Sequence, residues 1–180
     1  MLALAERLAR AEGADLEIVR TATLLHDVAR GRGDVPSHDH ARAGAEFARR
    51  LLAGQPPEKV EQVAQAIAAH RFRTGPAPQT LEARVLHDAD KLDAIGAIGV
   101  ARAFAFARHT GQRLWAAVPP DYVERTDTWR EHTPVHEFHV KLCKIKDRLF
   151  TASARQLAEE RHRFMVAFYE RLEREVRGLA

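Results

Sequence analysis

The sequence has little cysteine and no long hydrophobic run. Its 180 residues contain one cysteine, Cys143, so an internal disulfide is excluded and a reducing compartment is favoured. The apolar, uncharged run at residues 94–101 is far shorter than the roughly 20 residues that a membrane-spanning helix needs. The N-terminus carries Glu6 inside its apolar repeat, which argues against a signal peptide. We therefore expect a cytoplasmic protein with no membrane partner.

Lysine is also scarce, accounting for five of the 28 basic residues. The basic residues are dispersed among 25 acidic ones, and the formal net charge is only +3 despite a sequence pI of about 9.3. A nucleic-acid surface would need these charges to be concentrated on one face. We therefore expect no nucleic-acid partner. Two short basic clusters, residues 70–73 and 141–146, suit the phosphate groups of a small molecule as well as a nucleic-acid backbone.

Apolar residues recur at helical spacing through most of the chain, and the alternation typical of strands is missing. The length and the 46% hydrophobic content suit one domain over residues 1–180. Residues 109–135 lose the helical pattern and contain several prolines, which predicts an irregular flap. The predicted fold class is all-α, a single-domain helical bundle. Helices are expected at residues 2–12, 15–31, 37–52, 56–68, 80–106, 138–149 and 152–176.

The dipeptide His-Asp occurs three times, and the first copy, His26-Asp27, follows the apolar run Thr23–Leu25. We expect both side chains late in the second helix, at the edge of its buried face. A carboxylate in that position needs a metal ion or a cationic partner. The alternative is a structural pair in which Asp27 bonds an arginine.

A second acidic cluster, residues 87–93 (HDADKLD), lies inside the expected helix 80–106. Asp90 and Asp93 are three residues apart and share a side of that helix. A His-Asp pair and a distant helical carboxylate form a sound ligand set for a hard or borderline divalent ion. The alternative is a solvent-facing strip in which Asp88 and Asp90 form salt bridges with Arg84 and Lys91. His87 is expected at the surface, and a contact that supports Asp90 is the alternative. Asp88 lies about 200° around the helix from Asp90, so its loss should matter less.

Two segments together resemble the HD-domain phosphohydrolase superfamily, in particular its small single-domain bacterial members. They are residues 22–29 (ATLLHDVA) and 86–99 (LHDADKLDAIGAIG), and residues 141–147 (KLCKIKD) and 158–165 (AEERHRFM) resemble the same subgroup. The resemblance covers most of the chain and is weakest at residues 109–135. It implies a helical bundle of the HD-domain type.

The resemblance implies that His26, Asp27 and Asp90 hold one divalent metal ion. Mn²⁺ is the expected metal, with Mg²⁺, Fe²⁺, Ni²⁺ or Zn²⁺ as alternatives. Relatives carry a further ligand histidine near the first helix, whereas no histidine precedes His26 here. We expect that the natural start lies upstream of Met1, and the alternative is a natural loss of that ligand.

The implied activity is hydrolysis of a phosphate ester or anhydride in a small molecule, with a nucleotide as the expected substrate. Asp27 or Asp93 is expected to accept a proton and Lys91 to neutralise developing charge. The alternatives are a catalytically impaired nucleotide-binding or regulatory module and a guanosine tetraphosphate hydrolase. Substrate contacts are expected from His40, His70, Arg73 and Lys91. Larger members of the superfamily place ligands for a second metal at the positions of His40 and His70, so contacts to a second metal are an alternative for these two. Solvent-exposed or structural roles are the alternative for all four side chains.

Overall fold

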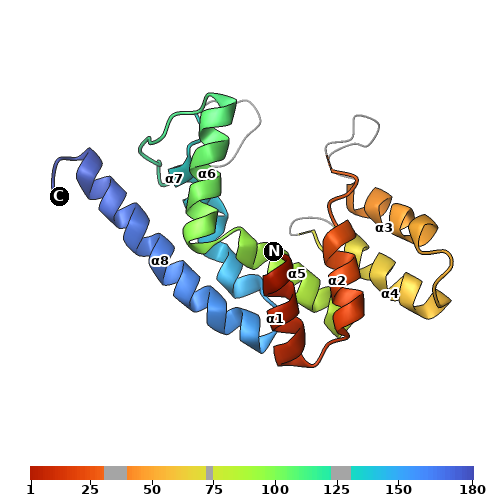
Figure 1. Cartoon of the computed structure of the whole chain (residues 1–180). Helices are drawn as coiled ribbons and strands as arrows, with labels where there is room; N and C mark the ends of the chain where they lie inside the picture. Colours follow the sequence, from red (N-terminus) through yellow and green to blue (C-terminus); the bar gives the residue numbers. More distant parts are fainter. Residues whose placement is uncertain (31–39, 72–74, 123–130) are drawn as a thin grey trace. The chain divides into compact units, whose positions relative to one another are not determined.

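The protein is a helical molecule in its computed structural model (Figure 1). The described residues contain no β-strand, which confirms the predicted all-α class. The chain divides into two compact units, and the expected single domain over residues 1–180 stays a prediction. Unit 1 comprises residues 1–91 and 149–154, and unit 2 comprises residues 92–148 and 155–180. The structure describes residues 1–30, 40–71, 75–122 and 131–180.

Unit 1 is built from the N-terminal helices. α2 contacts α1 and α4, and α3 lies beside α4 (Figure 1). Two predicted helix starts are confirmed. Asp15 caps α2 by accepting the backbone N–H of Glu17 at 2.8 Å, and Pro57 occupies the first turn of α4. The helices are α1 (Leu2–Glu12), α2 (Leu16–Leu25), α3 (His40–Leu51), α4 (Pro57–Ala68) and α5 (Leu81–Asp93), whose last two residues belong to unit 2.

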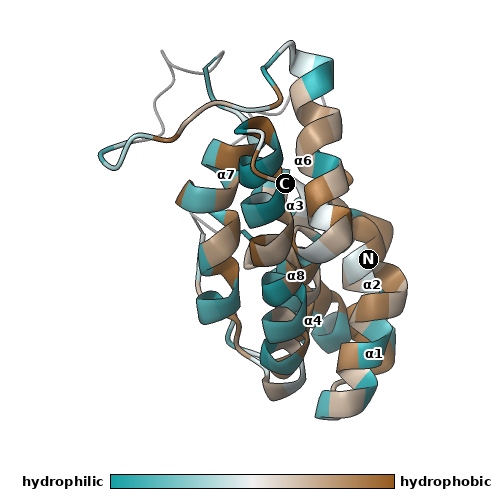
Figure 2. Ribbon diagram, turned by 90° about the vertical axis from the view of Figure 1, so that its left-hand side faces the viewer, coloured by the Kyte–Doolittle hydropathy of each residue, from teal (hydrophilic) through white to brown (hydrophobic). Residues whose placement is uncertain are grey.

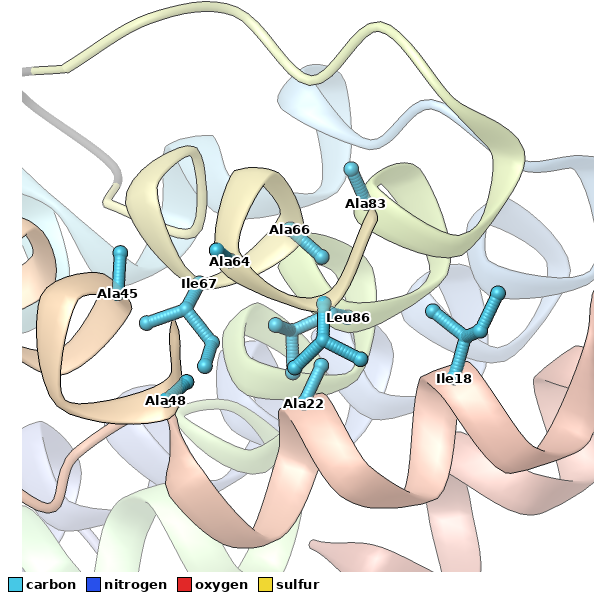
Figure 3. Close-up of a cluster of buried hydrophobic side chains, with 10 residues drawn as sticks. Ile18, Ala22, Ala45, Ala48, Ala64, Ala66, Ile67, Ala83 and Leu86 are labelled. Atoms are coloured by element: carbon cyan, nitrogen blue, oxygen red, sulfur yellow. The ribbon is translucent and has the colours of Figure 1, made fainter. Parts of the chain in front are cut away.

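The core of unit 1 consists of aliphatic side chains from α2, α3, α4 and α5 (Figure 3). Ile18, Ile67 and Leu86 supply much of its bulk and are almost completely buried. Alanines fill many of the remaining positions, and their small size allows the helices to pack closely. The apolar stripes expected from the sequence therefore do face a common core. The alanines in Figure 3 are Ala22, Ala45, Ala48, Ala64, Ala66 and Ala83.

Unit 2 contains α6 (Gly96–Thr110), α7 (Pro134–Val140), the 3₁₀ helix η1 (Leu142–Arg148) and most of α8 (Ala152–Val176). Both hydrophilic and hydrophobic residues occur along α8 (Figure 2), and its bounds match the prediction. The described part of the segment between α6 and α7 contains no helix, as expected for the flap. The continuous helix expected over residues 138–149 is wrong, because α7 ends at Val140 and a tighter helix follows.

The continuous helix expected over residues 80–106 is also wrong, because the chain breaks between α5 and α6. Ile95 has an extended backbone, and Gly96 has a φ of 78°. Only glycine adopts that left-handed conformation without steric cost. A Cβ atom at Gly96 would also lie 2.9 Å from Cγ of Arg161. The small residue therefore permits both a turn and a close contact, which helical periodicity alone did not indicate.

Among the described residues, no helix combines the length and the apolar character that crossing a bilayer requires.

Candidate metal centre

His26 and Asp27 lie immediately after α2, where the helix gives way to turns. α2 ends at Leu25, and residues 26–30 are in turn conformations. The prediction that the pair lies inside a longer helix is therefore wrong. The His26 side chain explains the early end, because its Nδ1 bonds the carbonyl oxygen of Thr23 at 2.7 Å. This carbonyl is one of those that the end of a helix leaves without a backbone partner.

The hydrogen bonds of two histidines define which ring nitrogen carries the proton. His26 Nδ1 lies 2.7 Å from the carbonyl of Thr23, and His70 Nδ1 lies 2.6 Å from the carbonyl of Ile67. A carbonyl oxygen only accepts, so each Nδ1 must donate a proton. In the neutral imidazole, Nε2 then presents a lone pair. Metal-binding histidines in proteins are commonly oriented in this way.

Three imidazoles meet at the carboxylate of Asp27. His26 Nε2 lies 3.6 Å from Asp27 Oδ2, while His40 Nε2 and His70 Nε2 lie 3.6 and 3.7 Å from Oδ1. The Nε2 atoms of His40 and His70 are 3.3 Å apart. The His26 and His70 rings meet edge to face, with centroids 5.2 Å apart. Side chains from three separate segments of unit 1 thus converge on one acidic group.

One oxygen of the Asp27 carboxylate lacks a hydrogen-bond donor, and a bound cation would compensate for this. Its Oδ1 atom is buried and has no hydrogen-bond partner among the described residues. Ligand atoms of Asp27, His40 and His70 all lie within 4.8 Å of one another. Imidazole nitrogens and carboxylate oxygens are the donors that borderline divalent ions bind. The residues present therefore fit a divalent metal ion.

Close packing of α3 brings His40 to this cluster. Gly44, one turn after His40, lies against the end of α2: a Cβ atom there would be 3.3 Å from the carbonyl oxygen of His26. It would also lie 3.3 Å from a methyl group of Ile67 on α4. A larger residue at position 44 would push α3 away from both neighbours. The glycine thus keeps the histidines of the cluster close.

Both acids expected to bind metal are held in their charged forms. Burial alone would raise the pKa of Asp27, but the nearby imidazole of His70, the hydrogen bond from Arg30 and the charge of His26 hold it well below its usual range. Burial likewise opposes ionisation of Asp90, but Lys91, His70 and His26 lower its pKa. Each carboxylate is thus kept ionised by a neighbouring cation, Arg30 at Asp27 and Lys91 at Asp90.

The other predicted site residues have diverse surroundings. Lys91 is buried and forms an ion pair with Asp90. Asp93 belongs to unit 2, where its carboxylate accepts a hydrogen bond from Arg102 at 2.7 Å. Arg73 lies outside the described residues. The structure thus brings four of the predicted site residues together at the Asp27 carboxylate, namely Asp27 itself, His26, His40 and His70.

Asp88 and His87 were not recognised as interior residues. Asp88 is 0% exposed and His87 is 5% exposed, so the surface position expected for His87 is wrong. The solvent-facing strip suggested as an alternative for residues 87–93 also fails at Asp88. A signal was available, because Asp88 lies three residues after Val85 and four before Leu92, on the buried face of α5.

Comparisons with known proteins agree with this fold. The sequence model of the HD domain family matches residues 1–95. The uncharacterized protein YpgQ of Bacillus subtilis is 36% identical over 182 residues, covering 98% of this chain and 80% of YpgQ. The crystal structure of YpgQ superimposes with a TM-score of 0.77 at 34% identity, covering 99% of this chain and 86% of that one.

Two further solved structures are similar over nearly the whole chain. YpgQ in complex with ADP has a TM-score of 0.74 and 32% identity, with 99% of this chain and 87% of that one covered. An HD-superfamily hydrolase from Bacillus thuringiensis has a TM-score of 0.70 and 30% identity, with coverages of 98% and 82%. The chain therefore belongs to the HD-domain family and has the fold of the HD-superfamily hydrolases.

Proposed function

We propose that this protein is a metal-dependent phosphohydrolase that acts on a nucleotide or a related small phosphorylated molecule. The observation that carries the proposal is the buried Asp27 Oδ1 atom, which has no hydrogen-bond donor among the described residues although three imidazoles surround the carboxylate. Membership of the HD-domain family supports hydrolase chemistry. The ADP complex of YpgQ supports a nucleotide as the class of ligand.

In this proposal, His26, Asp27 and Asp90 hold one divalent ion, with Mn²⁺ as the expected metal. The bond from His26 Nδ1 to Thr23 leaves Nε2 as the metal-binding atom. When bound, the ion supplies a Lewis acid that polarises a phosphoryl group and activates water. The two carboxylates neutralise its charge, and their lowered pKa values keep them ionised at neutral pH.

His40 and His70 are proposed to contact the phosphate of the substrate. Both reach the Oδ1 side of Asp27, whereas His26 reaches the Oδ2 side. A protonated imidazole donates from Nε2 and can bind a phosphoryl oxygen. The same two histidines, with Asp27, also satisfy the spacing of a metal-binding group. Metal stoichiometry separates these roles: one ion per chain supports phosphate contacts, and two ions support ligation.

The remaining residues are proposed to neutralise charge on the phosphoryl group and to accept the proton of the attacking water. Lys91, buried beside Asp90, is proposed to neutralise charge that develops on the phosphoryl group. Arg73 would pair with another phosphate oxygen. Asp27 is proposed to accept the proton of the attacking water.

A product-resolved hydrolysis screen tests the proposal. The purified protein is incubated with Mn²⁺ and a panel of nucleoside mono-, di- and triphosphates and guanosine tetraphosphate, and ³¹P NMR distinguishes released phosphate from pyrophosphate. We expect Mn²⁺-dependent turnover of at least one nucleotide. Asp90→Ala should abolish it, whereas Asp121→Ala, which removes an exposed carboxylate, should not.

The outcome also separates the alternative functions. Turnover confined to guanosine tetraphosphate would identify a hydrolase of the 3′-pyrophosphate group. Nucleotide binding with no release of phosphate or pyrophosphate would contradict the proposed activity and indicate a binding or regulatory module. Full activity in Asp90→Ala would show that the proposed ligand set is wrong.

A further inference from the structure

Asp88 is a fully buried carboxylate whose oxygens are saturated with hydrogen bonds. It accepts from the backbone N–H of Phe150 at 3.0 Å and from both the N–H and the hydroxyl of Thr151 at 2.7 Å. His87 Nδ1 completes the set at 3.1 Å. A buried charge is tolerated only when it is compensated in this way. Asp88 therefore ties α5 tightly to the segment that precedes α8.

A second carboxylate contacts the same segment from another helix. Glu12, at the end of α1, accepts the backbone N–H of Ser153 at 2.7 Å. Glu12 thus satisfies an N–H group in the first turn of α8, which a helix leaves without an internal partner, while Asp88 binds the two N–H groups just before α8. All of these residues belong to unit 1. The difference is that only Asp88 lies on the helix that carries Asp90.

The position of Asp88 on α5 bears directly on Asp90. The two residues are separated by about 200° around the helix axis. The hydrogen bonds of Asp88 hold one side of α5 against residues 150 and 151. Asp90 projects from roughly the opposite side, where its carboxylate forms an ion pair with Lys91. A rotation or an axial shift of α5 would therefore change the direction in which Asp90 projects.

We propose that Asp88 is a positioning residue of the metal centre, because its bonds to Phe150 and Thr151 fix the rotation of α5 and with it the direction in which Asp90 projects. The inference rests on the proposed function in one respect, namely that Asp90 binds the ion. Asp88 itself contacts neither metal nor substrate. Residues that orient metal ligands typically change metal affinity by 10- to 100-fold when they are replaced.

Calorimetric titration of Mn²⁺ into four proteins tests this role. Asp90→Asn should abolish binding, and Asp88→Asn should weaken it about tenfold or more, because the amide cannot accept all of the donors. Glu12→Gln is the matched control: it weakens a carboxylate bond to the same segment but leaves α5 untouched. It should change affinity by less than about twofold, even where it lowers the melting temperature as much as Asp88→Asn does.

A milder variant covers the case in which Asp88→Asn does not fold. Thr151→Val removes only the hydroxyl bond to Asp88 and preserves the backbone bond and the side-chain shape. It should weaken Mn²⁺ binding about threefold, in the same direction. Equal affinities of the folded Asp88→Asn protein and the wild type would overturn the inference, as would equal losses in Asp88→Asn and Glu12→Gln.

Amide hydrogen exchange of the metal-free proteins separates this inference from the proposed function. Asp88→Asn should speed exchange at Asp90 and Lys91, whereas Glu12→Gln should leave α5 unchanged. If the wild type bound no Mn²⁺, the metal centre would be wrong, and unchanged exchange at Asp90 in Asp88→Asn would independently overturn the positioning role. Faster exchange confined to that variant would support it.

Discussion

Each compact unit of this protein buries histidines beside a carboxylate, and the two carboxylates have very different partners. In unit 2, Glu137 Oε2 lies 3.1 Å from His132 Nε2, and Oε1 accepts a hydrogen bond from Lys141. In unit 1, Asp27 Oδ1 has no hydrogen-bond partner among the described residues. The first carboxylate is satisfied by the protein itself, whereas the second retains a buried oxygen to which no described donor is bonded.

The histidines differ in the same sense. Both ring nitrogens of His132 have partners, because Nδ1 lies 2.8 Å from the hydroxyl of Tyr122 and Nε2 faces Glu137. His26 instead commits Nδ1 to a backbone carbonyl and directs Nε2 toward Asp27, while the Nε2 atoms of His40 and His70 pair with each other beside the same carboxylate. A closed network stabilises a fold, whereas a set of converging acceptors suits a cation. Composition alone would not separate the two clusters.

Removal of the central carboxylate should have the largest effect. Asp27→Ala should lower Mn²⁺ affinity at least about 100-fold, because Asp27 belongs to every donor set proposed here. Isothermal titration calorimetry at pH 7 measures the change. Glu137→Ala, which removes the carboxylate of the other cluster, should bind Mn²⁺ as the wild type does. Equal losses in the two variants would mean that the contrast between the clusters has no functional meaning.

The second prediction concerns the cluster of Glu137, His132 and Lys141 in unit 2, which should stabilise the fold to a degree that depends on pH. Burial alone would raise the pKa of Glu137, but His132 and Lys141 lower it from 4.5 to about 2. A lowered pKa stabilises the fold above the unfolded value, and the contribution fades as pH falls from about 4.5 toward 2. Glu137→Gln should therefore lower the free energy of unfolding by about 3 kcal/mol at most at pH 7.

Urea unfolding of the wild type and Glu137→Gln at pH 7 and pH 3 checks this expectation. The difference between the two proteins should fall to roughly half at pH 3, because part of the Glu137 advantage is then lost. The control, Glu131→Gln, removes an exposed acid near this cluster and should behave as the wild type at both pH values. A difference that is independent of pH would show that packing, and not charge, is responsible.

The smallest expected effect concerns Arg30. Its guanidinium donates to Asp27 Oδ2 at 2.9 Å, although the side chain is 64% exposed. Arg30→Ala should tighten Mn²⁺ binding by up to about threefold, because an exposed cation that competes for the carboxylate contributes little in water. The gain should shrink at high salt. Weaker binding in Arg30→Ala would instead show that Arg30 orients the carboxylate for the metal.

The sequence predicted the helical class and the bounds of α8 well, because periodic apolar residues and caps are local signals. It failed at residues 26–30 and 94–96, where a side chain to backbone bond and a left-handed glycine end the helices. It also failed at Asp88, because a charged residue is expected in solvent unless its partners are known. Those partners lie more than 60 residues further along the chain.

By itself, the sequence determined which residues can carry the chemistry: one His-Asp pair, one acidic helix and two further histidines. It also determined most of the helices that hold them, since helix formation depends mainly on neighbouring residues. Only the tertiary structure decided that His40 and His70, separated by 30 residues, reach the same oxygen of Asp27. The physical reason is that this meeting depends on how closely α3 packs against α4 and the end of α2. Gly44 permits that approach, and no local pattern encodes it.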